Sequence, residues 1–180
     1  MKERTRPLLN ASALWDYALK VLGGRAHSSG ELREKLRRKA ERASDIDPTI
    51  ARLKEYGYLN DRKFAENFAA ARLENEGLGK TRVLADLSRR RVAPAVAQQT
   101  VGKVYQEIDE QALAEDFVRR KFRMASKESL FQGEKEMASA YRRLVRAGFR
   151  SSTVITVLKK FARNPDLLDA FEPPEETTEE

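Results

Sequence analysis

One short pattern occurs three times in this chain, about fifty residues apart. Each copy has a leucine on a helical face, basic residues close to it, and then a small or apolar residue where a turn follows. The copies span residues 34–40, 85–92 and 142–149. A period of this length is typical of stacked supersecondary units, each of which buries only a small core. The repeat therefore predicts an array of helical units, with basic helix ends recurring along it.

Apolar residues recur at helical spacing, and no stretch shows the sustained alternation of a half-buried strand. We predict nine helices, at about residues 12–22, 29–42, 48–56, 61–75, 80–91, 94–105, 109–124 and 134–147, with a last one capped by Ser151 or Ser152. The predicted fold is all-α, with three tandem three-helix repeats that form an elongated, curved array with disordered termini. Its predicted parts are a flexible basic N-terminus (1–10), repeats at 11–59, 60–106 and 107–163, and an acidic disordered tail (164–180).

Capping signals mark two of the helix starts. The run from Ser28 to Glu31 reads as a capping box, in which a hydroxyl and a carboxylate each satisfy a backbone amide. Asp47 followed by Pro48 predicts an N-cap and a proline at the first helical position. Trp15 lies next to the apolar face of the first helix, where we expect it to be a packing residue.

The segment 56–65 predicts a tight corner between two helices. Gly57 suits the left-handed conformation that closes a helix without a Cβ clash. Asn60 offers a side-chain acceptor to the amides of a new first turn, and Asp61 places a negative charge there. Leu59 and Phe64 occupy the two positions of a hydrophobic staple. The predicted structural motif comprises Gly57, Tyr58, Leu59, Asn60, Asp61 and Phe64, together with Gly148 and Phe149 at the end of a later helix.

Charge is distributed unevenly along the chain. The formal net charge is +7, and residues 164–180 hold seven acidic and no basic residues, so residues 1–163 carry 7 more, or +14. A basic body predicts an acidic partner, either nucleic acid or an acidic groove on a protein. Alternatively, the arginines only solvate helix faces, and the tail either folds over them or is simply a solvated terminus. The candidate partner-binding residues are Arg37, Arg38, Arg89, Arg90, Arg91, Arg119, Arg120, Arg142, Arg143 and Arg146.

Residue types that carry most enzyme and metal chemistry are sparse. The chain has no cysteine, so a disulfide or a thiolate metal site is excluded. His27 is the only histidine, and we expect it to be solvent-exposed. The run from Gly77 to Thr81 is not a phosphate-binding loop, because Glu74 stands where that loop needs its first glycine and a helix precedes it. We predict a protein that is not an enzyme and binds neither a metal nor a cofactor.

The sequence pattern also bears on location. No apolar run approaches the roughly 20 residues of a membrane span, and the basic, polar N-terminus lacks the apolar region of a signal peptide. We expect a cytoplasmic protein with no membrane partner. No coiled-coil seam is evident, so we expect a monomer.

The corner at 56–65 resembles the signature of the RecX family, bacterial regulators of the RecA recombinase. The similarity extends over about residues 11–163. Ala40 departs from the family pattern, which has a glycine after the basic pair, and the segment 125–133 and the acidic tail are poor matches. Residues outside the corner that resemble the family are Leu14, Tyr17, Ser29, Leu32, Leu36, Gly79, Val83, Leu87, Val92, Tyr141, Leu144, Arg146, Gly148 and Phe149.

The resemblance implies tandem three-helix repeats and a modulator of RecA, usually an inhibitor. By resemblance, the chain would bind in the groove of the RecA–DNA filament, with weak non-specific affinity for DNA, and would hinder filament extension, ATP hydrolysis and strand exchange. The alternative is a DNA-binding protein that acts without RecA, since three-helix units resemble helix-turn-helix modules. A plain helical scaffold is the third possibility.

Overall fold

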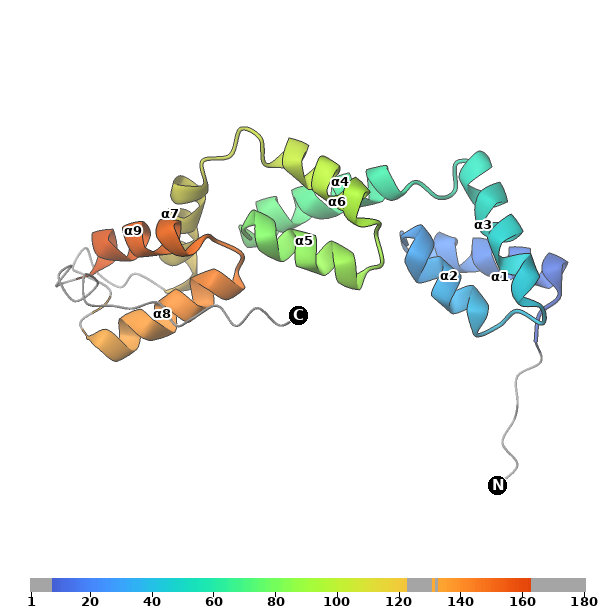
Figure 1. Ribbon diagram of the computed structural model, residues 1–180, viewed down its shortest axis with the longest axis horizontal. Coiled ribbons are helices and arrows are strands. Elements are labelled where there is room, and N and C mark those ends of the chain that lie inside the picture. Colours follow the sequence, from blue (N-terminus) through green and yellow to red (C-terminus); the bar gives the residue numbers. More distant parts are fainter. Residues whose placement is uncertain (1–7, 123–130, 132, 163–180) are drawn as a thin grey trace, which may run out of the picture. The chain divides into compact units, whose positions relative to one another are not determined.

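The computed structural model describes residues 8–122, 131 and 133–162, and these form nine α-helices and no β-strand (Figure 1). A 3-10 turn (Ala43–Asp45) precedes the third helix, and a π-helical turn (Arg72–Glu76) extends the fourth. The all-α prediction is confirmed. The helices are α1 (Ala11–Gly24), α2 (Ser29–Arg37), α3 (Ile46–Glu55), α4 (Asp61–Ala71), α5 (Lys80–Arg89), α6 (Pro94–Val104), α7 (Glu110–Lys121), α8 (Glu134–Arg146) and α9 (Ser151–Phe161).

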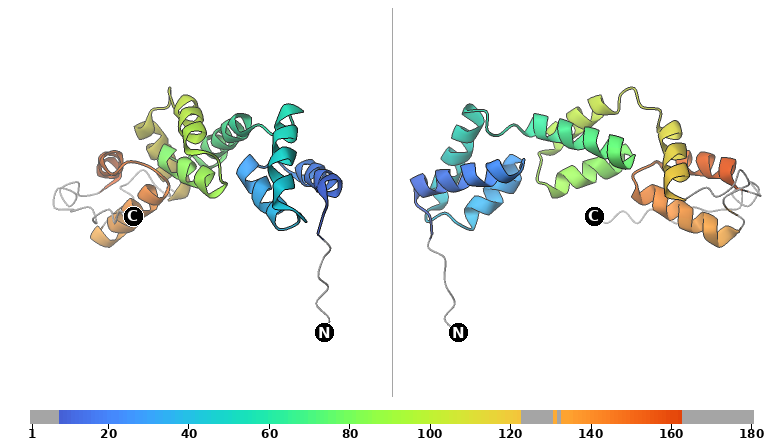
Figure 2. Two further views of the ribbon diagram at one scale, coloured as in Figure 1. Left: turned by 45° about the vertical axis from the view of Figure 1, so that its right-hand side comes forward. Right: turned by 180° about the vertical axis from the view of Figure 1, so that it is seen from behind.

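The described helices follow one another as three groups of three, as the repeat predicts. Figure 2 shows α1, α2 and α3 gathered together, and likewise α7, α8 and α9. The predicted boundaries of the repeats stay predictions, as does the elongated, curved shape. Most of the predicted flexible N-terminus and the whole predicted acidic tail lie outside the described residues, as does the segment 123–130.

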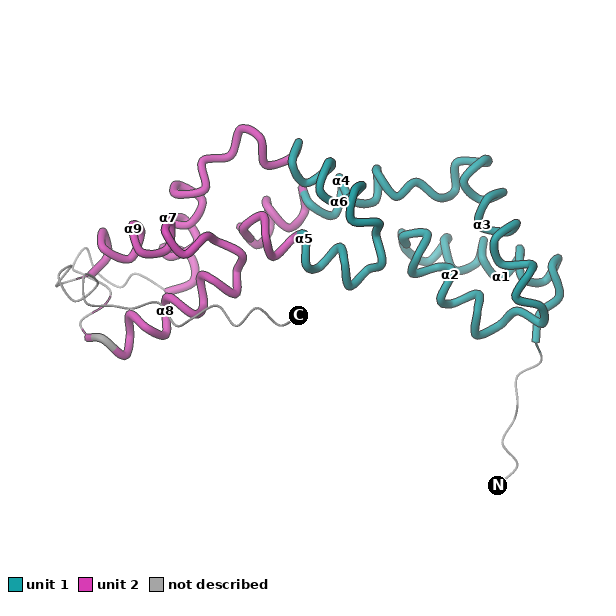
Figure 3. Tube along the Cα trace, in the orientation of Figure 1, with its two compact units in different colours: residues 1–69, 84–103 teal, residues 70–83, 104–180 magenta. Residues whose placement is uncertain are grey.

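The chain divides into two compact units, and the division falls inside the second repeat (Figure 3). The first unit comprises residues 1–69 and 84–103, and the second comprises residues 70–83 and 104–180. The second half of α5 and most of α6 therefore belong with the first repeat. The start of α5 belongs with the third repeat. Each unit consequently contains one junction between neighbouring repeats.

Leucines from three helices form the core of the first unit. Leu14, Leu32, Leu36 and Leu53 have no exposed surface and belong to one cluster. Burying a leucine contributes about 1.5–3 kcal/mol relative to leaving it exposed. Because α2 has only 9 residues, it is too short to be stable alone, and this packing rather than helix propensity holds it in place.

The core of the second unit contains aromatic side chains as well as aliphatic ones. Leu144 and Leu158 are fully buried, and Phe117 and Phe149 are nearly so. Gly148 has φ 93°, and the amide of Phe149 bonds back to the carbonyl oxygen of Leu144 at 3.3 Å. This turn brings the Phe149 ring edge-on to Phe117, with 5.6 Å between ring centroids. Phe149 thus closes over the end of α8, as predicted.

The corner between α3 and α4 forms as the sequence predicts. Gly57 has φ 75°, and its amide bonds to the carbonyl oxygen of Lys54 at 3.0 Å. The Tyr58 amide bonds to the carbonyl oxygen of Leu53 at 2.9 Å, which completes a Schellman motif. Asn60 Oδ1 accepts from the amide of Lys63 at 2.9 Å, which confirms the N-cap.

The two residues predicted to form a staple have other neighbours. Leu59 is 3% exposed and packs in the core of α1, α2 and α3. Phe64 stacks on Phe68, with 6.2 Å between ring centroids. Leu59 therefore anchors the corner to the first repeat.

The predicted end of α2 and the predicted start of α3 both differ from the structure. α2 ends at Arg37 rather than near residue 42, because Leu9 pairs with the chain after it. The Leu9 amide bonds to the carbonyl oxygen of Lys39 at 2.7 Å, and the Glu41 amide bonds to that of Leu9 at 2.8 Å. α3 begins at Ile46, so Asp47 lies inside its first turn and is not its N-cap, and Pro48 is not at the first helical position.

The last helix is capped from another helix. Arg150 is the N-cap residue of α9, and no side-chain hydrogen bond of its own caps the helix. The carboxylate of Glu110, in the first turn of α7, accepts from the Arg150 amide at 3.1 Å and from the Thr153 hydroxyl at 3.3 Å. The prediction that Ser151 or Ser152 is the cap is therefore wrong.

Candidate partner-binding surface

Neighbouring repeats join through their middle helices, which are α2, α5 and α8. In each junction, the start of one middle helix contacts the end of the middle helix in the next repeat. In the first unit, the Ser28 hydroxyl donates to the carbonyl oxygen of Arg90, directly after α5. A Cβ built on Gly30 would lie 2.3 Å from the carbonyl oxygen of Arg91. The amide of Ser29 donates to Asp61 Oδ1 at 2.7 Å, which ties α2 to the start of α4. The predicted capping box of Ser28 and Glu31 is confirmed and forms part of this junction.

The second unit contains a junction of the same plan. The Gly79 amide donates to the carbonyl oxygen of Ala147 at 2.8 Å, and the Arg82 guanidinium donates to that of Arg146 at 3.3 Å. A Cβ on Gly79 would lie 2.2 Å from the carbonyl oxygen of Gly148. In both junctions the accepting carbonyl comes directly before a residue of positive φ, Arg91 at 58° and Gly148 at 93°. The positive end of one helix dipole thus faces the negative end of the next.

Arg90 is a junction residue. Its guanidinium pairs with Glu31 Oε1 at 3.2 Å and lies 5.0 Å from the centre of the Phe68 ring. The side chain is about one-third exposed, at 32%. Of the predicted contact residues, this one is therefore held inside the protein by contacts from α2 and α4.

Three arginines surround the carboxylate of Glu34 in the first unit. Arg37 and Arg38 come from the end of α2, with nitrogen–oxygen distances of 3.3 and 3.5 Å. Arg91 approaches from the end of α5 at 3.9 Å. The junction therefore brings predicted contact residues of two repeats together, and one carboxylate among three guanidiniums leaves a local excess of positive charge. We call Arg37, Arg38 and Arg91 the first basic group.

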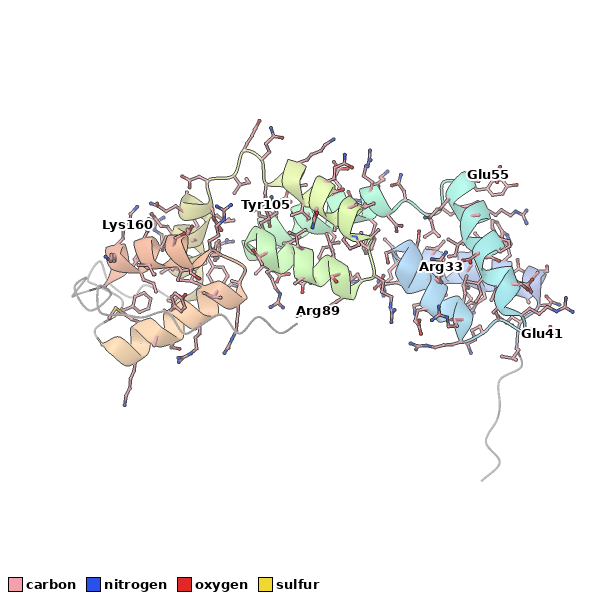
Figure 4. The ribbon with its side chains drawn as sticks, in the orientation of Figure 1. Arg33, Glu41, Glu55, Arg89, Tyr105 and Lys160 are labelled. Carbon is pink, nitrogen blue, oxygen red and sulfur yellow. The ribbon has the colours of Figure 1, made fainter. Side chains whose placement is uncertain are left out.

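Arg89 lies at the end of α5 with its side chain 68% exposed (Figure 4). Its guanidinium bonds to Asp86 Oδ1 at 3.0 Å, one turn back along the helix. Asp86 is almost fully buried, at 8% exposed. This pair fixes the direction of the arginine while leaving it accessible to a partner.

A second basic group lies where the end of α8 meets the start of α5. Arg142 and Arg146 are exposed and four residues apart, so they lie on one face of the helix. Among the described residues, neither has an ion-pair partner. Arg82 approaches the same helix end through the carbonyl oxygen of Arg146. Arg143 instead lies over the Phe122 ring, 4.9 Å from its centre. We call Arg82, Arg142 and Arg146 the second basic group.

The arginines of α7 are engaged differently. Arg119 pairs with Asp116 at 2.9 Å and with Glu115 at 3.3 Å. Arg120 fills the space beside Gly77, where an added Cβ would meet its guanidinium. These two residues contact acidic side chains and a turn of their own unit, and they are not part of either basic group.

Sequence reasoning missed Arg82. It stands at the third position of α5, as Glu31 does in α2. Because both middle helices begin with a glycine-containing turn, the third position of each was a recognisable signal for a junction residue. Comparing the ends of the same middle helices would have placed Arg90 and Arg91 in a junction.

Within the part of the chain that the structure describes, three titratable side chains have shifted pKa values, each for a structural reason. Burial lowers the pKa of His27, which is only 6% exposed, so the expectation that it is solvent-exposed is wrong. A hydrogen bond from Lys160 at 2.5 Å lowers the pKa of Glu115. Burial raises the pKa of Tyr105 to about 12, and its hydroxyl donates to the carbonyl oxygen of Leu78 at 2.8 Å. Figure 4 shows Lys160 on α9 and Tyr105 at the end of α6, in separate parts of the second unit.

The described residues hold no group of three or more histidine, aspartate or glutamate side chains placed to bind a metal ion. No helix among them has the length and apolar character to cross a bilayer. The prominent surface chemistry of the described residues is therefore the two basic groups and a cluster of aromatic rings beside Arg52.

Two family models match the chain. The model described as the first three-helix domain of RecX matches residues 15–53, and the model of its second three-helix domain matches residues 60–101. Two curated relatives are each called regulatory protein RecX. The one from Amycolatopsis mediterranei is 33% identical over 147 residues, 79% of each chain. The one from Deinococcus radiodurans is 32% identical over 152 residues, 83% of this chain and 69% of the relative.

Solved structures show the same fold. A crystal structure of RecX from Lactobacillus salivarius has a TM-score of 0.63 with 19% identity, and covers 84% of this chain and 96% of its own. A crystal structure of a regulatory protein RecX has a TM-score of 0.65 with 15% identity, and covers 83% of this chain and 73% of its own. At these identities the likeness concerns the fold alone.

Proposed function

The chain belongs to the RecX family of regulatory proteins, and on this basis we propose that it regulates the RecA recombinase by binding the RecA–DNA filament. The observation that carries the proposal is the family membership itself. In this role the protein binds along the filament groove, hinders filament extension and lowers the rates of ATP hydrolysis and strand exchange. It acts as a binding protein in the cytoplasm, without catalysis or a cofactor.

The two basic groups support this mode of binding. A filament carries the phosphates of its DNA, and cationic side chains that replace condensed counterions bind such a line of charge. The first group has three guanidiniums around Glu34, and in the second Arg142 and Arg146 are exposed without an ion pair among the described residues. Two such groups on one chain bind multivalently, so each alone needs only weak affinity. Weak affinity for naked DNA follows from the same charges.

Charge reversal tests the proposal. We expect the variants Arg37→Glu/Arg38→Glu and Arg142→Glu/Arg146→Glu each to bind RecA–DNA filaments at least about tenfold more weakly, since removing phosphate contacts lowers both affinity and its salt dependence. Binding is measured by fluorescence anisotropy of the labelled protein at several salt concentrations.

The matched control is Lys63→Glu/Lys103→Glu. Both lysines are exposed, on α4 and α6, and the substitution changes the net charge by the same amount. Equal weakening by the control would mean that only net charge matters, and the two basic groups would lose their role. Tight binding of the native protein to one DNA duplex without RecA would instead favour a helix-turn-helix protein that acts alone.

A further inference from the structure

Two exposed tyrosines lie at the α3–α4 corner, and the hydrogen bonds that form the corner do not use their rings. Gly57 supplies the positive φ, Leu59 fills the core and Asn60 caps α4. Tyr56 and Tyr58, by contrast, are 59% and 55% exposed, and neither hydroxyl has a hydrogen-bond partner among the described residues. Serine at either position would satisfy the geometry of the corner equally well. The aromatic rings therefore need another explanation.

The two tyrosines belong to a cluster built around Trp15. The indole ring of Trp15 lies edge-on to both phenol rings, with centroid separations of 5.9 Å to Tyr56 and 6.5 Å to Tyr58. The guanidinium of Arg52 lies over the indole, 4.3 Å from its centre, and 5.4 Å from the centre of Tyr56. Aromatic rings and α1 thus hold this arginine in one orientation.

Arg52 is a cation that is oriented but not neutralised. It is exposed, and no carboxylate among the described residues pairs with it. Most other well-placed arginines of the first unit do have one: Arg33 bonds to Asp47 at 2.7 Å, and Arg90 pairs with Glu31. A guanidinium has a planar fork of donors that fits a carboxylate through two hydrogen bonds.

An open groove of about 390 Å³ runs beside this cluster. Ala11, Ser12 and Trp15 of α1 form one wall, and Pro48 and Arg52 of α3 form the other. Asp45 and Thr49 also line the groove, and most of its lining surface is apolar. A single apolar side chain fits a groove of this kind, with Arg52 at its rim.

We propose that Trp15, Arg52, Tyr56 and Tyr58 form a protein-docking surface that receives a segment with an apolar side chain next to a carboxylate. Tryptophan, tyrosine and arginine are the residues most enriched where protein interfaces gain their affinity. The apolar side chain enters the groove, and the carboxylate meets Arg52. The partner proposed for the whole protein supplies this segment, so the inference rests on the proposed function and assigns RecA protein, rather than DNA, to this surface.

The geometry favours a protein over single-stranded nucleic acid. Bases stack on parallel, open ring faces beside a cationic track. Here Arg52 covers a face of the indole, and the two phenol rings are tilted 67° and 75° from it. Of the four residues of this surface only Arg52 is cationic, which is too little charge to follow a phosphate backbone. The basic groups, not this surface, suit the DNA backbone.

The test uses the full chain carrying Tyr56→Ser/Tyr58→Ser, and separately Arg52→Ala. Trp15 is left in place because it also packs against the first core. The probe is RecA assembled on single-stranded DNA, and the same DNA without RecA is measured in parallel. We expect filament affinity to fall about thirtyfold for the tyrosine variant, the effect of losing an interface hot spot. For the tyrosine variant, affinity for naked DNA and the salt dependence of filament binding should stay unchanged.

Two matched controls accompany the variants. Ile108→Ser removes another exposed apolar side chain, and Lys20→Ala removes one exposed positive charge from α1. Both should bind filaments like the native protein. If the tyrosine and arginine variants also do so, the docking surface is wrong while the proposed function stands. Equal losses on naked DNA would make the surface a base-stacking site and overturn the inference. Failure of the native protein to bind filaments would overturn both.

Discussion

At the scale of single residues, the burial of His27 could not be predicted from the sequence. Nothing in its neighbours along the chain predicts burial, yet it lies directly before Ser28, whose hydroxyl forms a junction bond. Its Nδ1 is 2.9 Å from the carbonyl oxygen of Arg25, and its buried Nε2 has no hydrogen-bond partner among the described residues. Because a carbonyl oxygen only accepts, this contact is a hydrogen bond when Nδ1 carries a proton.

This burial predicts a pH-dependent stability. The pKa of His27 is lowered in the folded chain, mainly by burial and further by Arg25 and Lys35, against opposing effects of the Arg25 carbonyl and Glu31. The unfolded chain thus binds more protons between the lowered pKa and about 6.5, and the free energy of unfolding falls as the pH drops through that window. Urea unfolding at pH 7.5 and pH 5.5 measures the loss. His27→Asn keeps a donor for the Arg25 carbonyl and should lose less stability over the same range; an identical loss would contradict this account.

At the scale of elements, helix identity is predictable from the sequence and helix ends are less so. The apolar period places each α-helix that the described residues form, and the corner at Gly57 and Asn60 forms as predicted, because its hydrogen bonds are local. Two of the errors occur where a distant segment provides the bond. Leu9 stops α2, and Glu110 caps α9, and neither partner is close in sequence. Local spacing contains no information about such contacts.

The junctions follow the same logic. Gly30 and Gly79 look like ordinary glycines at helix starts, yet each allows the backbone of the next repeat to approach closely. The sequence predicted the basic ends of α2, α5 and α8 as one binding stripe. The structure divides those residues between junction contacts, as for Arg90, and an accessible surface, as for Arg142. Whether an arginine lies in a junction or on the accessible surface depends on tertiary contacts, and the spacing of residues in the sequence does not predict these contacts.

Alanine substitutions at two helical glycines should therefore have opposite effects. Gly30→Ala places a Cβ 2.3 Å from the carbonyl oxygen of Arg91, a backbone atom that moves only if the junction opens. We expect a loss of about 1–3 kcal/mol, as in other overpacked sites. Gly102→Ala, inside α6, meets nothing within 4 Å and should gain roughly 0.4–1 kcal/mol from a less flexible unfolded chain. Urea denaturation of both variants measures this difference, and equal stabilities would show that the junction is not tightly packed.

At the scale of the whole molecule, different surfaces of the chain have different proposed tasks. In one junction the start of α2 contacts the end of α5, and in the other the start of α5 contacts the end of α8. Two basic groups remain accessible for a charged partner, and the aromatic surface around Arg52 is available to a protein segment. Family membership identifies the kind of regulator, and the division of labour among these surfaces is the proposal that solution experiments must test.

The central claim is that the chain regulates RecA through its filament, and the steady-state rate of DNA-dependent ATP hydrolysis by RecA tests it most directly. The native protein is titrated into RecA and single-stranded DNA at substoichiometric amounts, with Arg142→Glu/Arg146→Glu as the matched variant. We predict a progressive fall in the rate with the native protein and a much smaller one with the variant. An unchanged rate across the whole titration, with both proteins folded, would contradict the claim and leave DNA binding without RecA as the better account.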